Sequence, residues 1–277
     1  MAESEIKDHN LVIMAAGLSS RMSRSSPATH SLNGPKSMIP VGSAGRPFLD
    51  YLLDNAVEAG YRDIVIVVAA EDTMIRNRYS QSRRISFAEQ IIPEGRIKPA
   101  GTADALLCAL KQRPDWSGGK FTVCNSDNLY SSKALRLMLL SPHGNSLIAY
   151  NKKGLDLPDR KIAAFALLHL DADSRVLGII EKPERGLFTK LVNDNPDPGV
   201  SMNIFRFDYD MIIPILEEVP IDPVRDEKEM ATAVRVLIDR HPGSLRAVRL
   251  CEPVPDLTAW EDIEKMNEFI RDNYPDH

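Results

Sequence analysis

The chain has 277 residues, of which 43% are hydrophobic and 26% are charged, which is an ordinary globular composition. Its formal net charge of −5 gives no support to nucleic-acid binding, and no apolar run is long enough to predict a membrane span. The three cysteines, Cys108, Cys124 and Cys251, lack zinc-site spacing and favour a reducing compartment. Because the N-terminus is polar and unlike a signal peptide, we expect a cytoplasmic protein.

The first half of the chain alternates between short apolar strands and amphipathic helices. We expect strands at 11–16, 63–70, 84–92 and 120–124, and helices at 47–60, 102–111 and 132–140. This order is typical of a mainly parallel sheet that carries helices on both faces.

After about residue 145 the pattern changes to strands with short connections. We expect strands at 146–150, 161–170, 176–181 and 199–207, and helices at 214–219, 227–240 and 258–273. No repeat, low-complexity tract or Gly/Ser linker divides the chain. The sequence therefore predicts one domain over residues 1–277, of the α/β class, with a Rossmann-like mixed and mainly parallel sheet flanked by helices.

The first strand runs into a turn of small and polar residues: Ala15, Ala16, Gly17, Ser20 and Arg21. Small residues let the backbone approach a ligand closely, and successive N–H groups in such a turn can bind an anion. Arg21 and Lys36, the latter in Gly34-Pro35-Lys36, add cations that suit phosphate oxygens. The turn by itself fits a surface loop equally well, because the G-x-G-x-x-G spacing and the Walker sequence are both missing.

A second motif, Pro99-Ala100-Gly101-Thr102-Ala103-Asp104-Ala105, opens the helix expected at 102–111. Gly101 permits an abrupt start, Thr102 can cap the helix, and the alanines leave room for a flat ligand. A capped amphipathic helix would explain the leucines that follow, but it explains the Gly-Thr-Ala sequence only partly.

Two aspartates are candidate metal ligands. Asp127 follows the strand expected at 120–124, at the carboxyl end where open α/β sheets bind ligands. Asp256 lies late in the chain, just before the helix expected at 258–273. Each could instead be a helix cap. Two carboxylates together with phosphate oxygens would suit Mg²⁺, which keeps few protein ligands.

Two further strands end in or contain polar residues. The strand expected at 176–181 ends in Glu181-Lys182-Pro183, and the strand expected at 199–207 contains Asn203. A Glu-Lys pair at the end of a strand is usually a solvated edge, so these residues do not define a site by themselves.

Taken in order, these motifs resemble the sugar nucleotidyltransferase family, which includes NDP-sugar pyrophosphorylase-like enzymes, over about residues 11–270. The resemblance implies the nucleotide-diphospho-sugar transferase-like fold. It also implies transfer of a nucleoside monophosphate from an NTP to a sugar 1-phosphate, with Mg²⁺ as cofactor and release of pyrophosphate. Residues from about 11 to 145 would form a nucleotide-binding half, and those from about 146 to 270 an acceptor-binding half.

The resemblance also implies roles for individual residues. The nucleotide would lie against Ala15, Ala16, Gly17, Ser20, Gln90, Gly101 and Thr102. Catalytic cations would be Arg21, Lys36 and Lys182, with Lys182 holding the acceptor phosphate. Glu181 and Asn203 would bind the sugar, and Asp127 and Asp256 would bind the metal. Two departures from the family pattern are Ser19 and Asn203, which stand where relatives usually have glycine.

Two other functions stay open at the level of sequence. One is a cytidylyltransferase that acts on a small phosphorylated alcohol or amino alcohol, although Glu181 favours a polyhydroxyl acceptor. The other is a non-catalytic regulatory subunit that senses nucleotide sugars, although such relatives commonly lose a metal ligand or a signature cation. The expected partners are an NTP and a small phosphorylated substrate, with no nucleic acid or membrane, and a homo-oligomer is possible.

Overall fold

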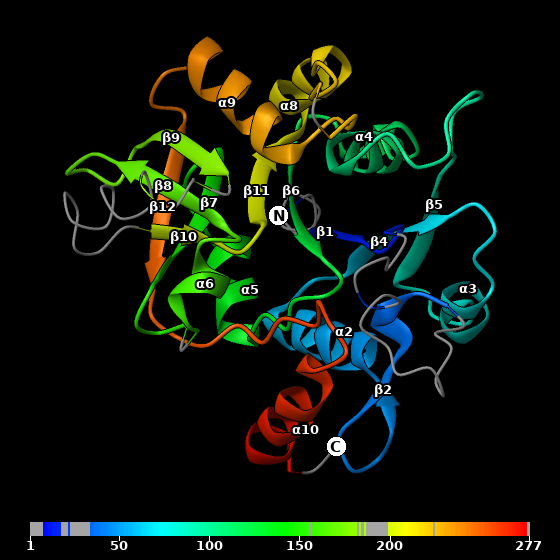
Figure 1. The fold of residues 1–277 in the computed structure, drawn as a ribbon. Coiled ribbons are helices and arrows are strands. Elements are labelled where there is room, and N and C mark those ends of the chain that lie inside the picture. Colours follow the sequence, from blue (N-terminus) through cyan, green and yellow to red (C-terminus); the bar gives the residue numbers. More distant parts are fainter. Residues whose placement is uncertain are drawn as a thin grey trace, which may run out of the picture.

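The computed structural model describes residues 8–17, 22, 34–155, 157–181, 183, 186, 199–223 and 225–275. Its central feature is a ten-stranded sheet in the order β5-β4-β1-β6-β11-β7-β10-β8-β9, with β12 paired to β7 (Figure 1). Strands from both halves of the chain therefore belong to the same sheet. Within the described residues, no helix is long and apolar enough to cross a membrane.

The first half of the chain forms the parallel part of the sheet. Its strands are β1 (Asn10–Met14), β4 (Asp63–Ala69), β5 (Ile85–Gln90) and β6 (Lys120–Asn125). All neighbouring pairs among them are parallel, with β1 between β4 and β6. Every residue of β1 is buried, as expected for a continuous apolar run covered on both faces. The predicted α/β fold is confirmed here.

The second half completes the sheet with β7 (Asn145–Asn151), β8 (Ala166–Leu170), β9 (Val176–Glu181), β10 (Gly199–Ser201), β11 (Ile204–Asp208) and β12 (Leu245–Leu250). Strand β11 is antiparallel to both β6 and β7, whereas β12 is parallel to β7. The sheet is therefore mixed as predicted, but its parallel pairs lie mainly in the first half.

Helices cover both faces of the sheet, and each face has its own hydrophobic core. One face packs against α2 (Phe48–Ala59), α5 (Ser132–Leu139) and α10 (Asp262–Asn273). The other packs against α4 (Thr102–Lys111), α8 (Tyr209–Glu218) and α9 (Met230–Arg240). Figure 1 shows these two groups on opposite sides of the central strands. The carboxyl ends of the parallel strands are left between the two layers.

Shorter elements complete the fold. They are η1 (Lys36–Met38), β2 (Pro40–Val41), β3 (Arg46–Pro47), α3 (Met74–Tyr79), η2 (Pro114–Trp116) and α6 (Asp159–Ile162). Strands β2 and β3 form a separate antiparallel pair. The sequence prediction contained neither α3 nor β12.

Two predicted strands differ from the structure. The strand expected at 161–170 is extended only over Ala166–Leu170, because the short helix α6 takes up its first residues. The strand expected at 199–207 is two strands, β10 and β11, which separate at Asn203. Asn203 has a φ of 58°, in the left-handed region that asparagine tolerates better than most residues. The resemblance stated above implies glycine at this position, and glycine adopts such a φ more readily than other residues.

Three helices begin at other residues than expected. Helix α8 starts at Tyr209, where the Asp208 carboxylate caps it by accepting the Met211 N–H at 3.0 Å, so Pro214 lies inside the helix. Proline prefers the first turn, which is why the sequence suggested a later start. Helix α9 begins at Met230 and α10 at Asp262, after extended or turn residues that precede each of them.

Candidate active site

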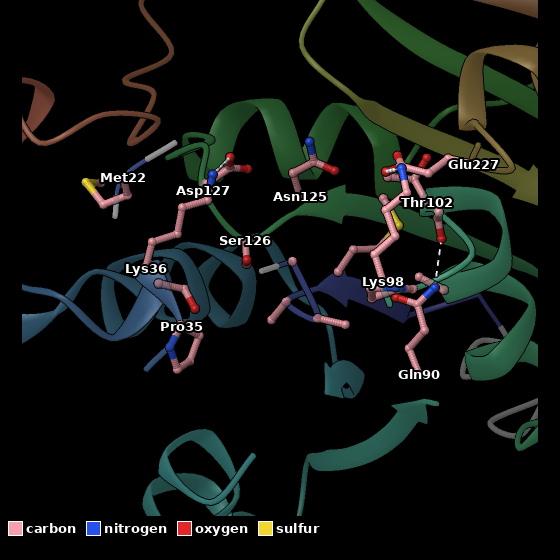
Figure 2. A pocket seen from close by; sticks show the side chains of 18 of the residues that line it. Met22, Pro35, Lys36, Gln90, Lys98, Thr102, Asn125, Ser126, Asp127 and Glu227 are labelled. Carbon is pink, nitrogen blue, oxygen red and sulfur yellow. Dashed lines mark hydrogen bonds and ion pairs between the residues drawn. The ribbon is translucent and has the colours of Figure 1, made fainter. Parts of the chain in front are cut away.

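A pocket of about 490 Å³ opens where β1 and β6 end, and Figure 2 shows the side chains that line it. Most of the residues expected to bind nucleotide or metal line this pocket: Ala15, Ala16, Gly17, Lys36, Gln90, Gly101, Thr102 and Asp127. Sequence segments that are far apart therefore converge at the carboxyl edge of the parallel strands, the usual ligand site of open α/β sheets.

The turn after β1 is held by its two neighbouring strands. The Ala15 N–H donates to the Val67 carbonyl at 2.8 Å, and the Ser126 N–H donates to the Met14 carbonyl at 3.2 Å. Ala15 and Ala16 are buried, whereas Gly17 is exposed and a Cβ added there would meet no atom of the described residues within 4 Å. The backbone of this turn is thus fixed on one side and open to the pocket on the other.

Lys36 reaches the pocket from η1 and forms an ion pair with the Asp127 carboxylate. Both side chains are mostly covered, with exposed fractions of 17% and 15%. The preceding turn packs tightly against α3, because a Cβ on Gly34 would lie 2.2 Å from the Met74 sulfur. Gly34 also has a φ of 132°, which only glycine adopts readily. Glycine at this position lets the turn place Lys36 in the pocket.

Asp127 and Asp256 are brought together by backbone hydrogen bonds between their segments. The Leu257 N–H donates to the Asp127 carbonyl at 2.8 Å, and the Leu129 N–H donates to the Pro255 carbonyl at 2.9 Å. Between these bonds, Asn128 and Asp256 form an antiparallel bridge. The two aspartates predicted as a metal pair therefore belong to one local structure, although the chain separates them widely.

The electrostatics of Asp256 show the effect of this pairing. Burial and then the nearby charge of Asp127 raise the pKa of Asp256 to about 6. The hydrogen bond with Thr258 and the positive charge of Lys36 oppose the rise. A divalent cation would relieve the repulsion between two such carboxylates. In the described part of the chain, no group of three or more His, Cys, Asp or Glu residues could hold a metal, so substrate and water would complete the coordination.

Gln90, at the end of β5, lies beside the start of α4. Its side-chain nitrogen donates to the Gly101 carbonyl at 2.8 Å and to the Asp104 carboxylate at 2.9 Å. Gln90 and Gly101 are eleven positions apart in sequence, yet the intervening loop brings them into contact. Because an amide nitrogen has two hydrogens and both are used, the amide oxygen is the group that Gln90 retains for a ligand.

Gly101 lies in close contact with another part of the backbone. Its φ is 116°, and a Cβ there would lie 2.5 Å from the Lys228 carbonyl oxygen and 2.7 Å from the Lys228 nitrogen. On either side of it, the Lys228 N–H donates to the Ala100 carbonyl at 2.6 Å and the Ala103 N–H donates to the Lys228 carbonyl at 2.9 Å. Glycine is required at 101 because the strap, by which we mean the described residues 222–223 and 225–229, crosses the start of α4 here.

Thr102 does not cap its own helix, so that prediction is wrong. Helix α4 has Gly101 at its N-cap and no side-chain cap bond. The Thr102 hydroxyl instead accepts the Met230 N–H at 2.9 Å, and Met230 is the first residue of α9. The hydroxyl is diverted because the strap brings the start of α9 next to the start of α4.

The residues predicted for the acceptor lie apart from the described lining of this pocket. Glu181 is the last residue of β9, and Arg225 donates to its carboxylate at 3.2 Å and to that of Glu229 at 2.6 Å. Burial raises the pKa of Glu229, against the opposing hydrogen bond from Arg225. Asn203 is held through its carbonyl, which accepts from the Tyr130 hydroxyl at 3.4 Å. Ser20, Arg21 and Lys182 lie outside the described residues.

Comparison with known proteins identifies the chain's relatives. The family model described as nucleotidyl transferase matches residues 10–276. The chain belongs to this family.

Individual relatives of this nucleotidyl transferase resemble it at modest identity. A bifunctional GlmU protein of Methanococcus vannielii is 26% identical over 95% of the chain and 56% of its own length. A glucose-1-phosphate adenylyltransferase of Corynebacterium kroppenstedtii is 27% identical over 66% of the chain and 45% of its own length. A glucose-1-phosphate adenylyltransferase 2 of Vibrio vulnificus is 24% identical over 97% of the chain and 66% of its own length. The chain spans about half the length of the first of these relatives.

Sequence reasoning missed the strap of this nucleotidyl transferase and its partner Lys98. Lys98 and Glu227 both line the pocket, and Arg225 is the partner of Glu181. In the sequence Arg225 and Glu227 stand in a run of charged residues of both signs at the start of a predicted helix, which normally indicates a solvated surface. The one signal available was the pair Gly101-Thr102, whose small size and hydroxyl indicated a close neighbour without identifying it.

Proposed function

We propose that this nucleotidyl transferase moves a nucleoside monophosphate from an NTP to a sugar 1-phosphate and releases pyrophosphate. The observation that carries the proposal is the pocket, where Gln90 and the start of α4 lie at one end and Lys36 with Asp127 at the other. Relatives named as glucose-1-phosphate adenylyltransferases support a sugar 1-phosphate as the acceptor.

The nucleotide would lie along this pocket. Its base would contact Gln90 and the small residues at the start of α4, Gly101 and Ala105, which both line the wall. Its phosphates would meet the backbone of the turn after β1 and the ammonium of Lys36. Arg21 and Ser20, outside the described residues, would add further phosphate contacts. Residues from about 11 to 145 would thus supply most of the nucleotide site.

The residues present fit a divalent metal ion, which we propose to be Mg²⁺. Asp127 and Asp256 supply hard carboxylate oxygens on adjoining segments, and their mutual repulsion favours a bound cation. When bound, the ion would neutralise charge on the reacting phosphate. Lys36 already compensates Asp127 in its absence, and it would be free to contact phosphate once the metal takes that carboxylate.

The acceptor would bind on the side of β9. Glu181 would accept hydrogen bonds from sugar hydroxyls, and Lys182 would hold the acceptor phosphate. Asn203, at the sharp turn between β10 and β11, would lie near the sugar. Residues from about 146 to 270 would therefore form the acceptor-binding half.

The reaction joins two anions, so positioning and charge neutralisation would provide most of the catalysis. An oxygen of the acceptor phosphate attacks the α-phosphorus in line, and the bond from that phosphorus to the pyrophosphate oxygen breaks. Lys36 would hold phosphate oxygens on the nucleotide side, and Lys182 would hold the attacking phosphate. The acceptor is already ionised at neutral pH, and no general base is needed.

A matrix of substrates tests the proposal. Each of the common NTPs is combined with a set of sugar 1-phosphates, and released pyrophosphate is measured with Mg²⁺ present. We expect release with at least one pair and none when either substrate is omitted. Release only with phosphorylated alcohols would favour the cytidylyltransferase alternative. Nucleotide binding without release for any pair would favour a regulatory subunit.

A further inference from the structure

The nucleotide pocket contains an ion pair that the proposed reaction does not use. The Lys98 ammonium donates to one oxygen of the Glu227 carboxylate at 2.8 Å, and both residues line the pocket. Each side chain is 31% exposed, so the pair is accessible from the pocket. Figure 2 shows the two side chains meeting near Thr102 and Gln90, at the opposite end from Lys36 and Asp127.

The backbone that carries Glu227 is fixed in place. Within the strap, the Asp222 N–H donates to the Glu227 carbonyl at 2.8 Å, and the two residues form a bridge. The next residue, Lys228, is bonded on both sides to the start of α4. Lys98 also donates to the Arg225 carbonyl, so both members of the pair are tied to the strap. The carboxylate is therefore held in position before any ligand arrives.

A carboxylate cannot face the phosphates of a nucleotide without like-charge repulsion. It must face a neutral part of the ligand that donates hydrogen bonds. Lys98 takes one Glu227 oxygen, and the other has no hydrogen-bond partner among the described residues. The base is expected at Gln90, whereas the ribose lies between base and phosphates and carries two hydroxyl donors. In many α/β nucleotide sites an acidic side chain binds these hydroxyls.

We propose that Glu227 accepts hydrogen bonds from the ribose hydroxyls of the bound NTP and makes the protein select ribonucleotides over deoxyribonucleotides. Lys98 is a positioning residue that orients the Glu227 carboxylate. The inference rests on the proposed function only in taking this pocket as the nucleotide site. It is independent of the acceptor and of the reaction.

The test measures nucleotide binding by titration calorimetry without an acceptor. The probes are an NTP that binds the wild type, its 2′-deoxy analogue and its 3′-deoxy analogue. A hydrogen bond to a charged group corresponds to a loss of about 10- to 100-fold in affinity when it is removed. We expect the wild type to bind the NTP at least about tenfold more tightly than the weaker analogue. Glu227→Gln should weaken NTP binding by a similar factor and leave that analogue unchanged.

The neighbouring Asp226 provides a matched control. Its side chain is 62% exposed, pairs with Arg96 and is not among the described residues of the pocket. Asp226→Asn removes the same charge from the same strap and should leave all three affinities as in the wild type. Thermal unfolding of each variant verifies that the fold is retained.

Several outcomes would overturn the inference. Equal losses for the NTP and both analogues in Glu227→Gln would indicate a structural role instead. Equal binding of NTP and both analogues by the wild type would exclude ribose selection even if the variant does not fold. A wild type that binds no NTP would overturn this inference and the proposed function together. If the protein selected ribonucleotides but released no pyrophosphate with any acceptor, the proposed function would be contradicted and this inference would stand.

Discussion

Lys36 and Asp127 form an ion pair at one end of the pocket, joining the turn before β2 to the segment that follows β6. The Lys36 ammonium is thus paired with the Asp127 carboxylate, which we propose as a metal ligand. A metal and Lys36 would compete for Asp127, and metal binding would release Lys36 toward the phosphates. This relationship gives Lys36 two opposite effects that one variant can separate.

Replacing Lys36 by alanine should therefore raise the affinity for a divalent metal ion and lower turnover. Without nucleotide, Lys36→Ala should bind Mn²⁺ more tightly than the wild type, because no ammonium competes for Asp127. Turnover should fall by about 10²–10³, the cost of removing a group that faces transition-state charge. Electron paramagnetic resonance of free Mn²⁺ and pyrophosphate release measure the two effects. The free energy of unfolding should fall by about 1–3 kcal/mol, because Lys36→Ala takes the cation away from a mostly covered carboxylate.

Lys133 offers a control for the loss of a lysine charge. Its side chain is 66% exposed and its closest carboxylate, on Glu252, is 3.8 Å away. Lys133→Ala should leave Mn²⁺ affinity and turnover unchanged. A Lys36→Ala protein with turnover within about threefold of the wild type would remove Lys36 from the mechanism.

The two aspartates should be required for turnover separately. Asp127→Asn and Asp256→Asn each keep the size of the side chain and remove one anionic ligand, so we expect turnover to fall at least about 100-fold in each. Excess EDTA should stop the wild type, and added Mg²⁺ should restore it. Full turnover in EDTA would contradict the metal proposal, and full turnover of one variant would remove that aspartate from the site.

Gly101 should be intolerant of any side chain because the strap crosses it. Gly101→Ala would place a Cβ 2.5 Å from the Lys228 carbonyl oxygen in a left-handed conformation, and we expect a loss of about 2–4 kcal/mol of stability. Nucleotide affinity should fall as well, since the strap carries Glu227. Urea unfolding and calorimetry measure the two losses.

Gly118 separates strain from steric conflict. It also has a positive φ, of 76°, but in the part of the chain that the structure describes no atom lies within 4 Å of a Cβ added there. Gly118→Ala should therefore cost only the conformational term, about 1 kcal/mol. If both variants lost the same stability, the close approach of the strap to Gly101 would carry no energetic weight.

A buried carboxylate in α2 should make stability depend on acidic pH. Asp50 accepts hydrogen bonds from Arg78 at 2.9 Å and from the Tyr79 hydroxyl at 2.6 Å. Burial acts to raise the pKa of Asp50, but these bonds and the charges of Arg78 and Arg46 outweigh it, and the net pKa is lowered from 3.8. A lowered folded-state pKa stabilises the fold above the unfolded-state pKa, and this contribution disappears as pH falls through the folded value.

Asp50→Asn should accordingly lower the free energy of unfolding at pH 7 by about 2 kcal/mol. The difference from the wild type should begin to shrink below about pH 4, the unfolded-state pKa, and should disappear as the pH falls through the lower pKa of the folded state. Urea unfolding at the two pH values measures it. Asp54→Asn is the control, because Asp54 is 46% exposed and forms an ion pair with Arg46. A difference that persisted unchanged in acid would show that the charge of Asp50 is not its source.

The sequence predicted the parallel half of the sheet well, because β1, β4 and β6 are mostly apolar runs separated by amphipathic helices. Strand β12 was missed because its arginines break the apolar pattern at an edge of the sheet. The segments that meet in the pocket were recognisable by motif. The strap was not recognisable, because its charged residues are typical of a solvated surface. Only tertiary packing brings Glu227 into the same pocket as Gln90. Contacts between segments that are so distant in sequence produce no periodic pattern from which they could be predicted.

The Thr102 hydroxyl accepts a hydrogen bond from the first residue of α9 and does not cap its own helix. Thr102→Val keeps the shape of the side chain but leaves the Met230 N–H without its acceptor. The expected loss is about 1 kcal/mol of stability, the usual value for a lost helix cap. Because Met230 directly follows the strap, Glu227 should also be held less firmly, and the preference for ribonucleotides should decrease. Thr102→Ser retains the hydroxyl and should match the wild type in both properties. If the valine variant matched the wild type in stability and in nucleotide preference, the hydrogen bond from Met230 to Thr102 would have no energetic weight.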